Sequence, residues 1–200
     1  DIDMKNAHPV IARYLCKKNG IDCPSLSYYI ENRDEILSRF DKSGKTLFLC
    51  ALNDDKLNRK IKDEFFKSFD KECKMIQTKL SELPEYKHIV DTVPEDRSYN
   101  WNGSAFNRIM CVYENKILQE VISLLNSKQI ELAALMFDGI MAYGDHYENT
   151  QLLRDIETHV NCIFQGLNMI FTYKEHNNEI VIPEDHETYD AERSNDDCYA

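Results

Sequence analysis

Two apolar runs, separated by Asp138 and Gly139, constrain the fold of this chain more than any other part of its sequence. They lie in the segment IELAALMFDGIMAYG, at residues 130–144. An Asp-Gly pair between two such runs favours the tight turn of a β-hairpin. The segment therefore predicts two antiparallel strands with Asp138 at the tip of the turn.

A third strand is predicted at the start of the chain, where residues 1–4 read DIDM and alternate polar with apolar side chains. Alternation places Asp1 and Asp3 on the same face of such a strand. Pairing of this strand with the hairpin would bring Asp3 close to Asp138, although the two residues are far apart in sequence. A last strand is expected at 167–173.

The remaining apolar spacing is helical, with steps of three or four residues. Ser25 is a plausible N-cap for the second of these helices. Residues 81–101 contain two prolines and predict an irregular connection. The expected helices cover residues 10–20, 25–40, 45–52, 55–80, 102–126 and 148–164.

This order of elements predicts an α+β fold, in which a small antiparallel sheet is covered by helices on one face. A hydrophobic content of 42% over 200 residues suits one folded unit. We expect that unit at 1–173, with a helical insertion at about 25–100. Residues 174–200 are acidic and poor in apolar side chains, which predicts a flexible tail.

The net charge of −11 is an objection to any function in nucleic-acid binding, because such domains usually carry a basic face. The charge is uneven, however. Residues 175–200 hold nine carboxylates and one arginine, whereas residues 33–74 hold eleven Lys and Arg against nine acids. The tail supplies much of the acidity.

The composition also bears on the compartment. Seven cysteines stand singly, with no CxxC pair, which is typical of a reduced intracellular protein. The chain shows no signal-peptide pattern and no apolar run long enough to span a bilayer. We therefore expect a soluble intracellular protein with no membrane partner.

Two carboxylates brought together by paired strands are the minimum that a two-metal phosphoryl transfer requires. Mg²⁺ suits such a site, because it binds oxygen ligands and often uses only one or two carboxylates plus substrate phosphates. The alternative interpretation is structural. Asp138 and Gly139 would then be turn formers, and Asp1 and Asp3 would be solvated acids at a strand end.

Three segments resemble the palm of family-A DNA polymerases, the DNA polymerase I group, over approximately residues 1–173. DIDMKNAHP resembles motif A, with Asp3 as the metal ligand. LMFDGIMAYG resembles motif C, with Asp138 as the second ligand. NGSAFNRIMCVYENKIL is similar to the helix that leads into motif C in that family, and it places Asn102 and Ser104 as nucleic-acid contacts.

The chain departs from the family pattern at several positions. His8 stands where the family commonly has a Glu beside the incoming sugar, and the His-Pro pair is closer to the Tyr-Pro of family-B polymerases. Phe137 and Gly139 replace the His and the second acid that flank the motif C aspartate. These departures leave sugar selection open.

A weaker resemblance concerns the fingers of that family. RDEILSRFDKSGKTLFLCALN is similar to motif B, the helix that carries an essential lysine. An ordinary amphipathic helix with solvated cations is the alternative. The resemblance implies nucleotide-binding roles for Lys45, Arg33, Arg39, Phe48 and Asn53, together with His8.

The function implied is template-directed nucleotidyl transfer, with Asp3 and Asp138 holding two Mg²⁺ ions, or Mn²⁺. Nucleoside triphosphates, primer-template DNA and other domains of a replication protein would be the partners. DIDMxNAHP segments resemble parts of replication proteins of large DNA viruses and mobile elements, where a palm lies within a longer polypeptide. Two alternatives remain: a catalytically inactive interaction module of palm ancestry, and a metal-dependent nuclease.

Overall fold

A computed structural model describes residues 1–41, 43–144, 146 and 149–174. The acidic tail expected from residue 174 onward lies outside the described residues, apart from Lys174 itself. None of the helices in the described ranges combines the length and hydropathy that crossing a bilayer requires.

The four strands of the described part form one antiparallel sheet in the order β2-β3-β1-β4. This confirms the predicted hairpin and its pairing with the first strand. The turn is one residue earlier than expected, because Gly139 already belongs to β3 and pairs with Met136. The strands are β1 (Ile2–Met4), β2 (Leu132–Met136), β3 (Gly139–Ala142) and β4 (Phe171–Tyr173).

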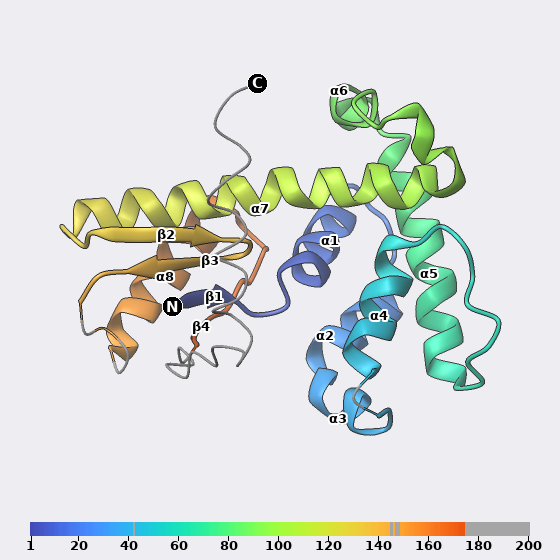
Figure 1. Ribbon diagram of the computed structural model, residues 1–200, viewed down its shortest axis with the longest axis horizontal. Helices are drawn as coiled ribbons and strands as arrows, with labels where there is room; N and C mark the ends of the chain where they lie inside the picture. The colour runs from blue at the N-terminus through green and yellow to red at the C-terminus, as the bar shows by residue number, and fades with distance from the viewer. Residues whose placement is uncertain (42, 145, 147–148, 175–200) are drawn as a thin grey trace, which may run out of the picture.

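Two helices bury one face of this sheet. The long α7 (Trp101–Ser127) runs past the sheet and continues over the helical part of the molecule, and α8 (Thr150–Ile163) lies behind the sheet in the view of Figure 1. Ile2 and Ile140 pair across β1 and β3 and are almost fully buried. The neighbouring pair, Asp3 and Gly139, faces the other side by the alternation of strand side chains.

The chain reverses sharply between β1 and α1 (Ala7–Lys18). Asn6 adopts a left-handed conformation with φ of 56°, which side chains such as Asn tolerate. The helix starts earlier than predicted, so Pro9 lies in its first turn, where a missing N–H costs no helical hydrogen bond. The expected end near Gly20 is confirmed, and Gly20 has φ of 64°.

The single helix predicted at 25–40 is wrong, because the chain breaks at Asn32 into two short helices. Ser25 is not the N-cap either. Glu72 supplies that function from a distant helix, since its carboxylate accepts hydrogen bonds from the backbone N–H of Ser25 (2.9 Å) and Leu26 (2.8 Å). The helices are α2 (Pro24–Glu31), α3 (Arg33–Ser38), α4 (Gly44–Asn53) and α5 (Glu64–Ser81).

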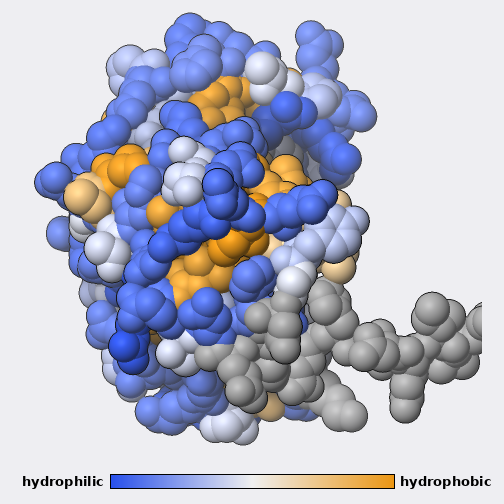
Figure 2. All heavy atoms as spheres, turned by 90° about the vertical axis from the view of Figure 1, so that its left-hand side faces the viewer, coloured by the Kyte–Doolittle hydropathy of each residue, from blue (hydrophilic) through white to orange (hydrophobic). Residues whose placement is uncertain are grey.

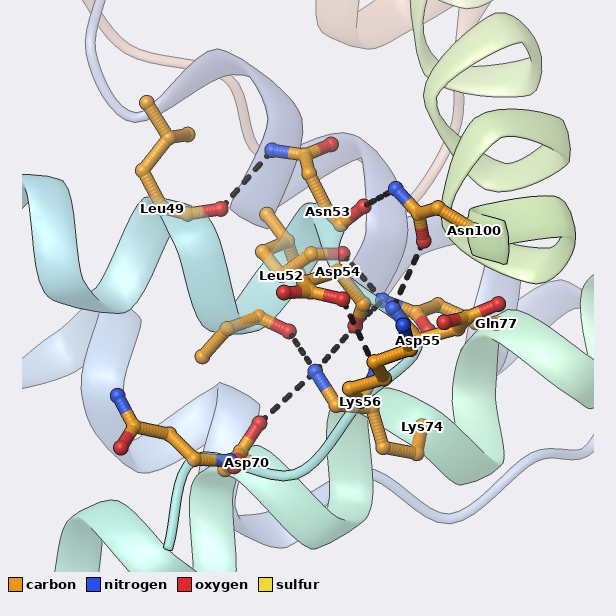
Figure 3. A network of polar contacts seen from close by, with 12 residues as sticks. Leu49, Leu52, Asn53, Asp54, Asp55, Lys56, Asp70, Lys74, Gln77 and Asn100 are labelled. Carbon is orange, nitrogen blue, oxygen red and sulfur yellow. Dashed lines mark hydrogen bonds and ion pairs between the residues drawn. The ribbon is translucent and has the colours of Figure 1, made fainter. Parts of the chain in front are cut away.

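The predicted helix at 55–80 also begins too early, because α5 starts only after the N-cap Asp63. The preceding loop is held by the polar network in Figure 3. Asp70 accepts from the backbone N–H of Asn58 at 2.7 Å and pairs with Lys74 at 2.8 Å. Lys74 also donates to the carbonyl oxygen of Ala51. These contacts fix the end of α4 against α5.

The connection predicted at 81–101 is not wholly irregular. It contains the 3₁₀ helices η1 (Pro84–Tyr86) and η2 (Glu95–Asn100) and the short α6 (Lys87–Val90). Asn100 donates to the carbonyl oxygen of Asn53 at 3.0 Å, so this segment also holds the end of α4.

The core is continuous from the sheet to the helices of the insertion. In the insertion it is aromatic: Phe48 stacks on Tyr29 with ring centroids 4.7 Å apart, and Phe69 packs against both rings. The fold is therefore α+β with a small antiparallel sheet, as the sequence predicted at that level.

Candidate active site

A pocket of about 490 Å³ opens between the sheet and the helical insertion. Its walls come from β1 and the start of α1, the tip of the β2–β3 hairpin, one side of α4, and the middle of α7. Six of the ten residues selected from the sequence line it, namely Asp3, His8, Arg33, Lys45, Phe48 and Asp138. Segments far apart in the chain thus converge on one cavity.

Asp3 lies at the centre of the sheet and is only 5% exposed. Its strand partners are Gly139 on β3 and Thr172 on β4. One carboxylate oxygen forms an ion pair with Lys174, the residue that follows β4. A buried carboxylate requires such compensation, because an unpaired charge in a protein interior is costly.

Gly139 is explained by the same carboxylate. A Cβ atom at this position would lie 2.1 Å from Oδ1 of Asp3 and 3.1 Å from the carbonyl oxygen of Ile2. Any side chain would therefore displace the carboxylate or the strand. The absence of a side chain at residue 139 thus leaves the space that the Asp3 carboxylate fills.

Asp138 is the last residue of the hairpin turn, directly before Gly139 of β3. Its carbonyl oxygen accepts a hydrogen bond from the backbone N–H of Met4 at 3.1 Å. Both aspartates therefore lie where β1 meets the hairpin, and both line the pocket. Burial raises the pKa of Asp138, and the charge of Glu114 adds to the rise, while His8 and Lys45 oppose it. Asp138 is thus a partly desolvated acid whose charge is stabilised by cations.

His8 connects the start of α1 to α7. Its Nε2 lies 3.1 Å from the carboxylate of Glu114, and Cys111 is a second hydrogen-bonding neighbour. Burial disfavours the charged imidazole, but these two contacts outweigh burial and raise the pKa of His8 to about 9. His8 is therefore a cation at neutral pH and belongs to the charge pattern of the pocket.

The pocket is richer in cations than the whole chain. Arg33 is mostly buried, and its Nε has no hydrogen-bond partner within the described residues. Lys45 is exposed at the first turn of α4. Four Lys and Arg side chains and three carboxylates line the pocket: Lys5, Arg33, Lys45, Lys174, Asp3, Glu114 and Asp138.

Four of the selected residues do not line the pocket. Arg39 is exposed and pairs with Glu35 one turn away on the surface. Asn53 is a structural residue, because its side chain accepts from Asn107 and its carbonyl oxygen accepts from Asn100. The other two, Asn102 and Ser104, are half-buried on the first turns of α7.

Asn102 accepts a hydrogen bond from Ser81 on α5, so it contributes to the contact between α5 and α7. Phe48 does line the pocket, but it is 1% exposed and belongs to the aromatic core. Its ring forms part of the pocket floor rather than a free stacking surface.

Sequence reasoning missed Glu114 and Lys174. Lys174 directly follows the strand predicted at 167–173, and the strand predicted at residues 1–4 carries two acids. A cation at the end of the one strand could therefore have been predicted to pair with an acid of the other. Glu114 lies on α7 and meets His8 of α1 only because the two helices pack together. The residues around Glu114 in the sequence therefore do not reveal this contact.

The two carboxylates fit a divalent cation by their chemistry. Asp3 is buried and already neutralised by a cation, and Asp138 has a raised pKa that a cation would reverse. No third His, Cys, Asp or Glu joins them in a cluster within the part of the chain that the structure describes. A Mg²⁺ ion held here would complete its coordination with water or phosphate oxygens.

Comparison with known proteins gives a similarity to a viral protein. The sequence matches no protein-family model, and it matches no solved structure. It is 30% identical over 187 residues to a protein of the Sputnik virophage that carries the name "Putative helicase V13". The match covers 84% of this chain and 23% of the virophage protein, so the chain spans less than a quarter of that relative's length.

Gly44, Lys45 and Thr46 reproduce the end of the P-loop motif G-x-x-x-x-G-K-[ST], which binds phosphates in many helicases. The first glycine of the motif is replaced by Arg39, however, and the loop follows helix α3 where a P-loop follows a strand. A helicase motor of that type is therefore not built around Lys45.

Proposed function

We propose that this chain is the palm, with a fingers-like insertion, of a nucleotidyltransferase that extends a primer on a template within a larger viral replication protein. The observation that carries the proposal is the convergence of Asp3 and Asp138, from β1 and the hairpin, on a pocket whose opposite wall carries Arg33 and Lys45. The resemblance of the same segments to family-A polymerase motifs supports it.

In this proposal Asp3 and Asp138 would hold two Mg²⁺ ions. When bound, the metals would lower the pKa of the primer hydroxyl and neutralise charge on the triphosphate. Gly139 leaves the space in which the Asp3 carboxylate is placed. The close pairing of β1 with the hairpin keeps both acids at one end of the sheet without reorganisation.

Lys45 and Arg33 would bind the triphosphate from the opposite wall, because fixed cations stabilise the charge that develops on transferring phosphoryl oxygens. The unpartnered Nε of Arg33 is a donor that a phosphate oxygen would satisfy. His8, charged and paired with Glu114, would border the sugar end of the pocket. A pocket of about 490 Å³ is in the size range of small-molecule sites.

The similarity to the virophage protein supports the setting of the proposal. That relative is much longer than this chain, as expected for a palm that is one part of a replication polypeptide. Motor and polymerase functions would then occupy different parts of such a protein. The grip on the primer-template duplex would also come from outside this chain.

A second candidate is a non-catalytic interaction module. It is favoured by β2, an edge strand whose apolar side chains Leu135 and Met136 are about half exposed. The tip residue Phe137 is 88% exposed with φ of 53°. Figure 2, which looks at the left-hand side of Figure 1, shows apolar surface interrupting a mostly hydrophilic face. Such patches on a single chain often mark contacts with other proteins.

The test is titration of Mn²⁺ or Mg²⁺ with a labelled nucleoside triphosphate, followed by incubation with a labelled primer-template. We expect metal-dependent nucleotide binding that is lost in Asp138→Asn and weakened about tenfold or more in Lys45→Met, as for a charge-assisted contact. Arg39→Gln is the matched control, because Arg39 is a neighbouring cation outside the pocket.

The outcomes separate the candidates. Extension of the primer supports the polymerase, and shortening supports a nuclease that uses the same acids. Nucleotide binding that is absent, or equal in the wild type and Asp138→Asn, would contradict the proposed function and favour the interaction module.

A further inference from the structure

Lys174 lies beside Asp3 and supplies the positive charge that a bound metal ion would otherwise supply. Its ammonium group is paired with Oδ2 of Asp3, and no part of the proposed reaction requires that contact. The two partners differ strongly in freedom. The Asp3 side chain is 7% exposed, whereas the Lys174 side chain is 59% exposed.

The backbone explains why the lysine reaches the acid. The N–H of Lys174 donates to the carbonyl oxygen of Asp1 at 3.0 Å, which continues the pairing of β1 with β4 by one residue. The side chain therefore starts from a fixed point at the sheet edge and ends at the pocket, which it lines. A lysine is a compact charge on a flexible stem, so its head group can leave while its backbone stays.

We infer that Lys174 is an internal substitute for the divalent cation: it neutralises Asp3 while the site lacks metal, and it is displaced when the metal binds. The inference rests on the proposed function, since it requires a metal site at Asp3. It adds that the chain itself competes with the metal. The ammonium group of Lys174 and a divalent ion cannot both occupy the position next to Oδ2 of Asp3.

The ion pair with Lys174 affects both the stability of the fold and the affinity of the site for a metal ion. Without Lys174, the buried Asp3 carboxylate would have no cationic partner among the described residues, and an uncompensated buried charge destabilises a fold strongly. With Lys174 in place, the incoming cation must first break that ion pair, so part of its binding free energy is lost. The Lys174–Asp3 ion pair thus keeps the fold stable without metal and lowers the affinity of the site for metal. Binding of a metal ion would then be favoured when the ion arrives together with the phosphates of a nucleotide.

The experiment measures Mn²⁺ binding to the full chain by the electron paramagnetic resonance signal of free Mn²⁺, with no nucleotide present. Lys174→Met keeps the apolar stem and removes the charge. We expect it to bind Mn²⁺ roughly two- to fivefold more tightly than the wild type, the range for loss of a partly exposed ion pair. Lys174→Arg, which keeps the charge, should bind Mn²⁺ like the wild type.

Two controls isolate the site. Lys5→Met removes an exposed cation that lines the same pocket, so it reports any general effect of net charge. Asp3→Asn removes the ligand, so the difference between it and the wild type excludes weak binding by the many other carboxylates of this acidic chain. The tightening in Lys174→Met should disappear when Asp3→Asn is combined with it.

Thermal unfolding gives a second readout. In EDTA, Lys174→Met should melt below the wild type, because the Asp3 carboxylate is left uncompensated. Saturating Mn²⁺ should then raise its melting temperature by more than it raises that of the wild type, since tighter binding to the folded state gives more stabilisation.

The results distinguish failure of the inference from failure of the proposed function. If the wild type binds Mn²⁺ through Asp3 but Lys174→Met binds it equally or more weakly, Lys174 is not a competitor and the inference is overturned while the metal site stands. If no variant shows Mn²⁺ binding that depends on Asp3, the metal site and the inference both fall.

Discussion

Replacement of Gly139 by alanine tests whether the sheet is built around the Asp3 carboxylate. A Cβ atom at this position would meet Oδ1 of Asp3 at 2.1 Å, whereas ordinary contacts with a Cβ begin at 3.4 Å. The overlap exceeds 1 Å and also involves the carbonyl oxygen of Ile2. The Ile2 carbonyl belongs to a central strand and cannot shift without disturbing the pairing of β1 with β3, and rotation of the Asp3 carboxylate would break its ion pair with Lys174.

Overpacking of a well-packed site costs about 1–3 kcal/mol, and the size of this overlap places Gly139→Ala in the upper half of that range. A loss of about 2 kcal/mol corresponds to a fall in melting temperature of about 4–8 °C for a chain of this size. The assay is urea unfolding of the full chain followed by circular dichroism, without divalent metal.

The control is the same substitution in an Asp3→Ala background, where the carboxylate that causes the overlap is absent. There we expect Gly139→Ala to cost less than half as much, which leaves a coupling free energy of about 1 kcal/mol or more between the two positions. Equal costs in the two backgrounds would refute the reasoning, because the clash would then not depend on the carboxylate.

Three further outcomes follow from contacts elsewhere. The pKa of His8 rises from 6.5 in the unfolded chain to about 9 when folded, so its stabilising contribution is complete below pH 6.5 and lost as the pH rises to 9. The loss, at most about 3 kcal/mol, should vanish in His8→Gln when unfolding is measured across that range. Glu72→Ala should cost about 1–2 kcal/mol by uncapping α2, whereas Ser25→Ala should cost under about 0.5 kcal/mol in the same urea titrations. Asp70→Ala should cost about 3 kcal/mol or more, because it leaves Lys74 partly buried and unpaired, and a smaller loss by calorimetry would count against the network of Figure 3.

The elements that sequence reasoning predicted well are those whose signals are local. The hairpin has an Asp-Gly pair between two apolar runs, and α7 has a continuous apolar stripe over 27 residues, so both needed no knowledge of distant contacts. The pairing of β1 with the hairpin was expected as the arrangement that would bring Asp3 close to Asp138, and the structure confirms it.

The errors arose where a distant residue decides the local structure. The helix predicted at 25–40 breaks, and its first part is capped by Glu72, which is 46 residues away from Leu26. The start of α5 moves to Glu64, because Asp70 binds the backbone of Asn58 and holds the preceding loop in a non-helical path. Periodicity alone does not report such contacts.

The same distinction applies to the candidate site. Asp3, Asp138 and Lys45 were selected from motif-like segments, and the structure brings all three to one pocket. Asn53 was selected from the same kind of resemblance, yet its polar atoms are used to hold α4 against α7. A residue type at a motif position therefore predicts a location better than it predicts which partner the side chain will take.

The net charge of −11 was the main objection to nucleic-acid binding, but net charge and the charge within one pocket are different quantities. Fields of exposed charges are screened within a Debye length of about 8 Å at physiological ionic strength, so a bound phosphate responds mainly to the groups that line its pocket. Those groups include four Lys and Arg side chains, the imidazolium of His8 and only three carboxylates. Two of the three carboxylates are the candidate metal ligands, whose charge a divalent cation would offset. The acidity of the whole chain therefore opposes binding of a long duplex much more than it opposes binding of a single nucleotide, and a polypeptide that used this chain for synthesis would need its basic duplex-binding surface in another part.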